Sequence, residues 1–369
     1  MSPLTLVLFI AGIVLLISGA ELLVRGASRL AVSIGITPLI VGLTVVAFGT
    51  GSPELAVGVQ ASLAGQADIT IGNVVGSNIF NVLLILGISS LVAPLVVSQQ
   101  LVRLDVPIMI VVTLALLMMS LDGVIDRADG IVLVLASIGY TIVLIRISRR
   151  ETAMVKNEYD IAYGAAPGKT VRRWPMHMLL VVTGLALLVI GAEWLVDGAV
   201  TIASALGVSE LVIGLTVIAA GTSLPEVATS IIAGLRGERD IAVGNVVGSN
   251  LFNILVVVGC TALIAPGGLT VAPAAINFDM PVMLAAAVLC LPIFFVNYRI
   301  GRWQGALFLS YYIFYMLYLI LDASHHDATP AFSAVMLYVV IPLTLLTVAL
   351  SFVRELQRRF RAARTQRIS

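Results

Sequence analysis

The stretch that decides the fold is GNVVGSNIFN at residues 72–81, because it recurs as GNVVGSNLFN at residues 244–253. About 36 of the 69 residues from Gly19 to Gly87 are identical to the residue 172 positions later, where chance would give a handful. The same shift aligns three more motifs: GAE at 19–21 with 191–193, GLTV at 42–45 with 214–217, and PE at 53–54 with 225–226. A shift of 174 then places LDVP at 104–107 on FDMP at 278–281. The chain therefore consists of two homologous halves.

The composition places both halves in a membrane. Apolar residues make up 60% of the chain and charged residues 11%, and the mean hydropathy is +1.09. A soluble domain carries about a quarter charged residues, and a membrane-spanning helix needs about 20 mostly apolar ones. On this criterion we predict eleven spans, at 3–24, 36–64, 69–92, 104–121, 128–147, 175–196, 208–235, 240–264, 279–297, 302–321 and 330–353.

The predicted fold is an all-α polytopic membrane protein with two inverted five-helix repeats and one extra C-terminal transmembrane helix. We predict four segments: the first half at 1–147, a polar cytoplasmic linker at 148–174, the second half at 175–322, and the eleventh helix with a basic cytoplasmic tail at 323–369. Because each half has an odd number of spans, the halves insert upside down relative to each other. This arrangement is typical of secondary transporters that alternate access around a site at the membrane midplane.

The positive charges predict the orientation. If the N-terminus lies outside, 20 of the 21 Lys and Arg residues fall in cytoplasmic segments, and only Arg127 lies outside. The opposite topology reverses that score and violates the positive-inside rule. We therefore expect the N-terminus outside and the C-terminus in the cytoplasm.

Each half carries one acidic residue directly after a proline in the middle of an apolar segment: Glu54 after Pro53, and Glu226 after Pro225. Proline has no amide hydrogen and clashes with the carbonyl four residues back, so the helix should break there. Broken backbone at this depth is tolerated only inside protein or along a cavity, and an acid within a membrane span indicates function. Inverted halves should bring the two carboxylates together. The alternative, that both acids are structural or protonated, leaves their symmetric pairing unexplained.

A polar stripe follows on the next helix of each half. Asn73, Ser77 and Asn81 are spaced four residues apart, and Asn245, Ser249 and Asn253 repeat the pattern, so each set lies along one face of a helix. We favour cation ligation over interhelical hydrogen bonding for the residues Ser77, Asn81, Ser249 and Asn253. Both interpretations stay open for Asn73, Asn78, Asn245 and Asn250.

Carboxylates, hydroxyls and carbonyls are hard oxygen ligands, which suit Ca²⁺, whereas the absence of a thiolate or imidazole cluster argues against Zn²⁺ or copper. Other charged residues are interpreted as structural. Asp105 and Asp279 precede a proline by two residues, which is an N-cap pattern. Glu21 can pair with Arg25 one turn later, and the role of Glu193 stays open.

At these motifs the sequence resembles the cation/Ca²⁺ antiporter superfamily, specifically the prokaryotic sodium/calcium exchangers. The resemblance covers both halves and implies a ten-helix core with Glu54 and Glu226 as central acidic ligands. It further implies ligation by hydroxyl, amide and backbone carbonyl oxygens of Thr50, Thr222, Ser223, Ser77, Ser249, Asn81, Asn253, Ala47 and Ala219. In that family Ca²⁺ and Na⁺ compete for overlapping sites, and the first helix of each half slides to alternate access.

Two residues depart from the family pattern. Gly51 stands where a serine matching Ser223 is expected, and the neighbouring Ser52 could supply the missing hydroxyl. Asn253 stands where many relatives carry an aspartate, which leaves two central acids and makes a K⁺ requirement less favoured.

The predicted function is Na⁺ for Ca²⁺ antiport by alternating access across a prokaryotic plasma (inner) membrane. The alternatives are H⁺-coupled Ca²⁺ antiport and, in another class, a cation channel. We expect a transporter and not an enzyme, with Ca²⁺, Na⁺ and the lipid bilayer as partners, no cofactor, no nucleic acid and no obligate protein partner.

Overall fold

The structure, a computed structural model, describes residues 3–150, 174–205, 219–324 and 326–366. Within these ranges nine helices are long and apolar enough to cross a membrane, and one bent helix pair supplies a tenth. Most of the predicted linker, the GLTV copy at 214–217 and the start of the predicted span at 208–235 lie outside the described residues. The predicted all-α polytopic fold is confirmed.

The first half begins with the long helix α1 (Pro3–Ile34) and continues into a broken second span. That span contains α2 (Pro38–Val41), the π-helix η1 (Gly42–Val46), α3 (Ala47–Thr50) and α4 (Ser52–Leu63). The third and fourth spans are α5 (Ala67–Phe80), η2 (Asn81–Ile85) and α6 (Leu86–Val92), then η3 (Leu101–Asp105) and α7 (Val106–Met119). The fifth span is α8 (Arg127–Arg150), and two short strands, β1 (Leu95–Val96) and β2 (Val124–Ile125), flank the fourth span.

The second half repeats this order. It runs through α10 (Trp174–Ala205), α12 (Ala219–Gly221), α13 (Leu224–Leu235), α14 (Arg239–Phe252), η6 (Asn253–Val258), α15 (Gly259–Ile264), β3 (Leu269–Thr270), η7 (Ala275–Asp279), α16 (Met280–Phe295), β4 (Arg299–Ile300) and α17 (Arg302–Ala323). Helices dominate because a span in lipid must satisfy its backbone hydrogen bonds internally.

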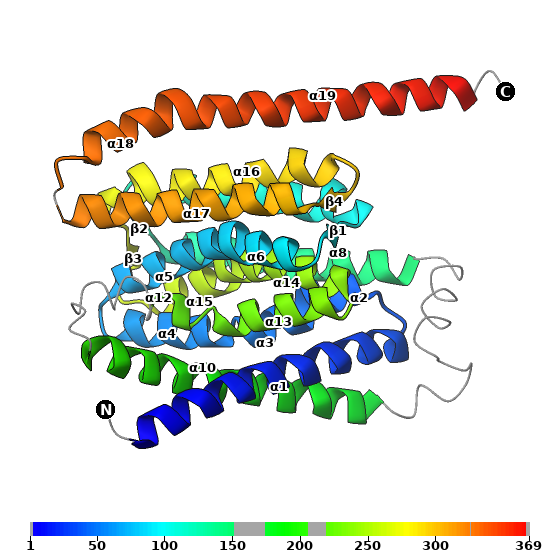
Figure 1. Ribbon diagram of the computed structural model, residues 1–369. Coiled ribbons are helices and arrows are strands. Elements are labelled where there is room, and N and C mark those ends of the chain that lie inside the picture. Colours follow the sequence, from blue (N-terminus) through cyan, green and yellow to red (C-terminus); the bar gives the residue numbers. More distant parts are fainter. Residues whose placement is uncertain (1–2, 151–173, 206–218, 325, 367–369) are drawn as a thin grey trace.

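Two antiparallel strand pairs show how the halves are related. Strand β1 pairs with β4, and β2 pairs with β3, so each ribbon takes one strand from each half. The repeat shift of 174 carries β1 onto β3, yet the two ribbons lie at opposite ends of the helices (Figure 1). Equivalent loops of the two halves are therefore at opposite ends of the bundle, which confirms the inverted arrangement.

The first helices of the two halves, α1 and α10, pack directly against each other along one side of the molecule (Figure 1). Glycines spaced seven residues apart line the contact. A Cβ built at Gly19 would lie 2.8 Å from the Gly184 carbonyl oxygen, and one at Gly12 would lie 2.9 Å from the Gly191 carbonyl oxygen. These two contacts are related by the repeat shift. The glycines thus let the two backbones approach closely, as small residues do between membrane helices.

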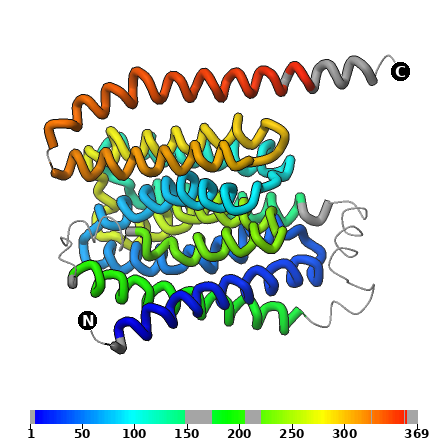
Figure 2. The backbone as a smooth tube through the Cα atoms, in the orientation of Figure 1, coloured from blue at the N-terminus to red at the C-terminus, as the bar shows by residue number. Residues whose placement is uncertain are grey.

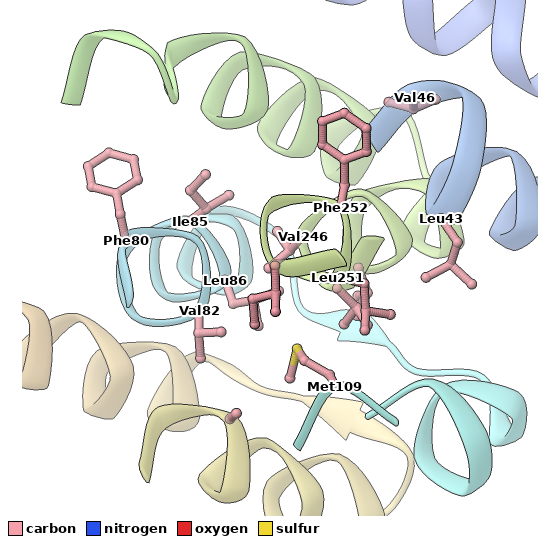
Figure 3. Close-up of a cluster of buried hydrophobic side chains, with 14 of the residues drawn as sticks. Leu43, Val46, Phe80, Val82, Ile85, Leu86, Met109, Val246, Leu251 and Phe252 are labelled. Atoms are coloured by element: carbon pink, nitrogen blue, oxygen red, sulfur yellow. The ribbon is translucent and has the colours of Figure 1, made fainter. Parts of the chain in front are cut away.

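The third span of each half lies at the centre of the molecule. The spans Ala67–Val92 and Arg239–Ile264 are 78% buried over their apolar stretches, against 33% for the first helix. Their apolar side chains form the core together with the fourth span: Phe80, Val82, Ile85 and Leu86 from one half lie near Val246, Leu251 and Phe252 from the other, with Met109 below them (Figure 3). The predicted polar stripe is on these two central helices.

The C-terminal segment consists of α18 (Thr329–Val335), η8 (Met336–Val340) and α19 (Ile341–Gln366). It runs along the outside of the bundle, beside α16 and α17 (Figures 1 and 2). None of its apolar stretch is buried. One hydrogen bond, 2.8 Å from the Tyr311 hydroxyl to Thr344 Oγ1, and a ring contact between Phe295 and Phe352 link α19 to the core helices.

The predicted N-caps at Asp105 and Asp279 are wrong. The helices start earlier, at Leu101 and Ala275, so both residues have helical backbone angles and make no capping bond. Asp105 instead accepts hydrogen bonds from Tyr140 (2.9 Å) and Gln100 (3.2 Å). Asp279 accepts one from Tyr315 (2.8 Å). These acids join neighbouring helices, because inside a helix the nearby amides already have partners.

Candidate cation-binding site

The second span of the first half is broken where the sequence predicts. Helix α3 ends at Thr50, α4 begins at Ser52, and the helix axes bend by 44°. In the second half α12 ends at Gly221 and α13 begins at Leu224. Pro53 and Pro225 occupy the first turns of α4 and α13, where the missing amide hydrogen costs nothing.

Glu54 and Glu226 follow these prolines in the first turns of α4 and α13. The N-terminus of a helix carries a partial positive charge, which favours a carboxylate at this position. Each residue is only 1% exposed, and the two carboxylates are close enough to interact electrostatically. In each, the Oε2 atom is buried without a hydrogen-bond partner among the described residues. The two acids therefore meet inside the protein and keep unused acceptor oxygens.

Hydroxyl groups from one half reach the carboxylate of the other. The Ser223 hydroxyl lies 3.4 Å from Glu54 Oε1 and 3.2 Å from the Ser77 hydroxyl. Thr222 also interacts with Glu54, and Thr50 interacts with Glu226. The two broken segments thus contact each other, so that each carboxylate lies near groups from both repeats.

The polar stripes supply further oxygens. Asn81 and Asn253 are 1% exposed, and Ser249 is fully buried. Their Oδ1 and Oγ atoms have no hydrogen-bond partner in the described part of the chain. The amide oxygens of Asn73 and Asn245, in contrast, have hydrogen-bond partners. Asn73 Oδ1 accepts a hydrogen bond from the Thr222 hydroxyl at 3.4 Å, and Asn245 Oδ1 accepts one from the Thr50 hydroxyl at 3.2 Å. This places Asn73 and Asn245 behind the threonines, where they orient the hydroxyls.

The remaining expected ligands, Ser52 and the carbonyls of Ala47 and Ala219, show no hydrogen bond to the two acids among the described residues. Ser52 is half-buried, and its hydroxyl donates to the Phe48 carbonyl of its own helix at 2.8 Å. The Ala47 carbonyl accepts from the Gly51 amide at 2.9 Å, and Ala219 is the first residue of α12. The Ser52 hydroxyl hydrogen is thus directed to its own helix, and ligation by Ser52 in place of the hydroxyl that Gly51 lacks stays a prediction. A Cβ on Gly51 would lie 2.7 Å from the Phe252 ring, so this ring fills the space that a serine would need.

The donor set fits a hard cation. In the described ranges no group of three or more His, Cys, Asp or Glu residues gathers, whereas the buried oxygens without a hydrogen-bond partner include those of Glu54, Glu226, Asn81, Asn253 and Ser249. Buried polar atoms without partners are costly, and Ca²⁺ and similar ions are bound by such oxygens. Sequence reasoning left the roles of Asn78 and Asn250 open and did not predict their direct contact, because only the packing of the two halves determines it.

Comparison with known proteins agrees with this geometry. The chain matches the family described as "Sodium/calcium exchanger protein" over residues 4–146 and 176–321. It is 39% identical over 273 residues to the "Putative antiporter CaxA" of Alkalimonas amylolytica, covering 74% of this chain and 83% of the relative. It is also 29% identical over 320 residues to the "Sodium/calcium exchanger MaX1" of Methanosarcina acetivorans, covering 79% and 91%.

Among solved structures, one of the sodium-calcium exchanger NCX_Mj superposes with a TM-score of 0.74 at 31% identity. The match covers 86% of this chain and all of that one. The matched regions contain both broken segments and both polar stripes. With two inverted halves, two buried neighbouring carboxylates and this breadth of similarity, the chain belongs to the sodium/calcium exchanger protein family.

Proposed function

We propose that this chain, which family membership makes a membrane transporter that exchanges cations with Ca²⁺, uses Na⁺ as the exchanged ion. It works by alternating access across the plasma membrane of a prokaryote, with the N-terminus outside. The observation that carries the proposal is the set of unpaired buried oxygens around Glu54 and Glu226. The bound ions are substrates, and no cofactor is needed to explain the site.

The charge of the site explains why the two loads exclude each other. Two carboxylates contribute a charge of about −2, and leaving such charges buried without a counterion is strongly destabilising. One Ca²⁺ or two Na⁺ neutralise this charge equally well. Because both loads use the same carboxylates, one must leave before the other binds. Such mutual exclusion at a shared site is what an antiporter needs.

The site also favours Na⁺ over H⁺ as the coupling ion. The oxygens beyond the carboxylates belong to amides and hydroxyls, such as those of Asn81, Asn253 and Ser249. These groups do not titrate in the physiological range, yet they are suitable ligands for a metal ion. Exchange of two Na⁺ for one Ca²⁺ would be electroneutral, whereas each additional Na⁺ would move one net charge and so draw about 2.3 kcal/mol per 100 mV.

Transport by the purified protein in sealed liposomes tests the proposal. Vesicles loaded with Na⁺ are diluted into Na⁺-free buffer that contains radioactive Ca²⁺, and a parallel set carries only a pH gradient. We expect Ca²⁺ uptake that requires the Na⁺ gradient. Uptake driven by the pH gradient alone would replace the proposal by H⁺-coupled exchange.

Two variants localise the activity. Glu226→Gln keeps the shape of the side chain and removes one charge, so we expect uptake to fall by at least about 100-fold, as for breaking a buried charge pair. Asp322→Asn is the matched control, because Asp322 is an exposed acid near the end of α17 in the same half, just beyond the predicted span at 302–321. Normal transport by Glu226→Gln would refute the assignment of the site.

A further inference from the structure

We propose that Asn78 and Asn250 are positioning residues that turn the amide oxygens of Asn253 and Asn81 toward the transported cation. The inference deepens the proposed function and rests on it, since it concerns the same site. Neither residue is needed as an ion ligand. Each acts on the ligand of the opposite half.

The two asparagines form a symmetric bridge between the halves. Asn78 Nδ2 donates to the backbone carbonyl of Asn250 at 3.3 Å, and Asn250 Nδ2 donates to the backbone carbonyl of Asn78 at the same distance. The residues are 172 positions apart, which is the repeat shift. They therefore face each other across the pseudo-two-fold axis, where they are 1% and 3% exposed.

The side-chain oxygens of the bridge determine how the neighbouring amides are turned. Asn253 Nδ2 donates to Asn78 Oδ1 at 3.0 Å, and Asn81 Nδ2 donates to Asn250 Oδ1 at 3.0 Å. An asparagine amide has one oxygen acceptor and one nitrogen donor. Once the nitrogen is held by the bridge, the oxygen must point the other way. The Oδ1 atoms of Asn81 and Asn253 are the buried ones that lack a partner.

The orientation matters because a flipped amide would present hydrogen atoms to a cation. Asn81 follows Ser77 by one turn of the helix, and the Ser77 hydroxyl contacts Ser223 beside Glu54. The ligand stripe thus continues from the carboxylate to Asn81. Without the bridge, the amides of residues 81 and 253 could rotate freely between a ligating and a repelling orientation. The bridge removes the second orientation before the ion arrives.

A double-mutant cycle on Ca²⁺ binding tests the proposal with the full-length protein in detergent. The Ca²⁺ dissociation constant is measured by calorimetry for the wild type, Asn78→Ala, Asn253→Ala and the double variant. We expect Asn78→Ala to weaken binding roughly five- to tenfold, about the value of one net hydrogen bond. If Asn78 acts through Asn253, its substitution has no further effect once Asn253 is alanine.

The matched control is the cycle of Asn78→Ala with Thr50→Ala, because Thr50 contacts Asn245 and Glu226, and neither of these residues bonds Asn78 in the described structure. Their effects should multiply. Multiplying effects for Asn78 and Asn253 as well would overturn the proposal, since a purely structural bridge weakens binding whatever stands at 253. The mirror cycle, Asn250→Ala with Asn81→Ala, repeats the test if Asn78→Ala does not fold. Loss of folding in both single bridge variants would also overturn it and leave the bridge structural.

The outcomes separate this inference from the proposed function. Ca²⁺ binding to the wild type, and the effect of Na⁺ on it, are measured first. If Na⁺ does not compete with Ca²⁺, the result contradicts Na⁺ coupling and leaves the positioning role untouched. The cycle needs only Ca²⁺ binding. If Na⁺ competes with Ca²⁺ in the wild type and the effects of Asn78→Ala and Asn253→Ala multiply, the proposed Na⁺/Ca²⁺ exchange is supported. The positioning role of Asn78 is then refuted.

Discussion

Single residues explain why the symmetry of the site is imperfect. Ser223 connects Glu54 to Ser77, but its counterpart Gly51 cannot connect Glu226 to Ser249 in the same way. The Phe252 ring occupies the space beside Gly51 and also makes an edge contact with Phe48, with ring centroids 5.2 Å apart. The two halves therefore offer unequal ligand sets to the ions.

This packing predicts that the symmetric residue is not tolerated at position 51. Gly51→Ser should lower stability by about 1–3 kcal/mol, the usual cost of overpacking a core, and thus lower the melting temperature of the purified protein. Adding Phe252→Leu makes room and should recover most of the loss. An unchanged melting temperature for Gly51→Ser alone would show that the ring moves aside without cost.

The buried acids and the polar stripes, which we propose as ligands, are the part of the site that could be located most directly from the sequence. A carboxylate after a proline in an apolar run is conspicuous, and so is a polar stripe at helical spacing. Both predictions needed only the period of a helix and the cost of burying charge. The bridge between Asn78 and Asn250 could not be found in this way, because it depends on the distance between two helices that are 172 residues apart in the chain.

At the scale of the element, hydropathy located the spans but not their ends. The first and sixth spans were predicted at 3–24 and 175–196, and the helices extend to Ile34 and Ala205. A helix can continue beyond the apolar run when polar residues leave the membrane and find partners. Arg25, for example, lies just beyond the predicted end at residue 24 and pairs with Glu21 at 2.5 Å, as predicted. Glu21 also pairs with Arg236, which follows α13.

The α1–α10 contact gives a prediction at this scale. Gly19→Leu should lower the melting temperature and impair transport, because a Cβ at this position already lies 2.8 Å from the backbone of Gly184. Gly139→Leu is the control: it is also within a membrane helix, α8, but no described atom lies within 4 Å of its Cβ position. Melting curves and Ca²⁺ uptake are compared for the two variants. Equal behaviour would contradict a need for close backbone packing between α1 and α10.

At the scale of the whole molecule, the pseudo-symmetry connects sequence to mechanism. Two homologous halves with five predicted spans each had to be inverted, and the ribbons β1–β4 and β2–β3 show that they are. Inversion brings two half-helix N-termini and two carboxylates to one place, which neither half could do alone. Each ribbon contains one strand from each half. The inverted symmetry therefore also joins loops of the two halves by hydrogen bonds at both ends of the bundle.

The eleventh span has no counterpart in this symmetry, and its packing predicts that exchange does not depend on it. Its apolar stretch is unburied, and the family match ends at residue 321. A chain that stops after Ser324 loses the Tyr311–Thr344 hydrogen bond and the ring contacts Phe295–Phe352 and Phe314–Phe332 but keeps every proposed ligand. Such a loss costs about 2–4 kcal/mol at the surface of the bundle, so Ca²⁺ uptake in liposomes should stay within about twofold of the full chain. A truncated protein that folds, as judged by its melting curve, but does not transport would show that the eleventh span takes part in the motion of the core.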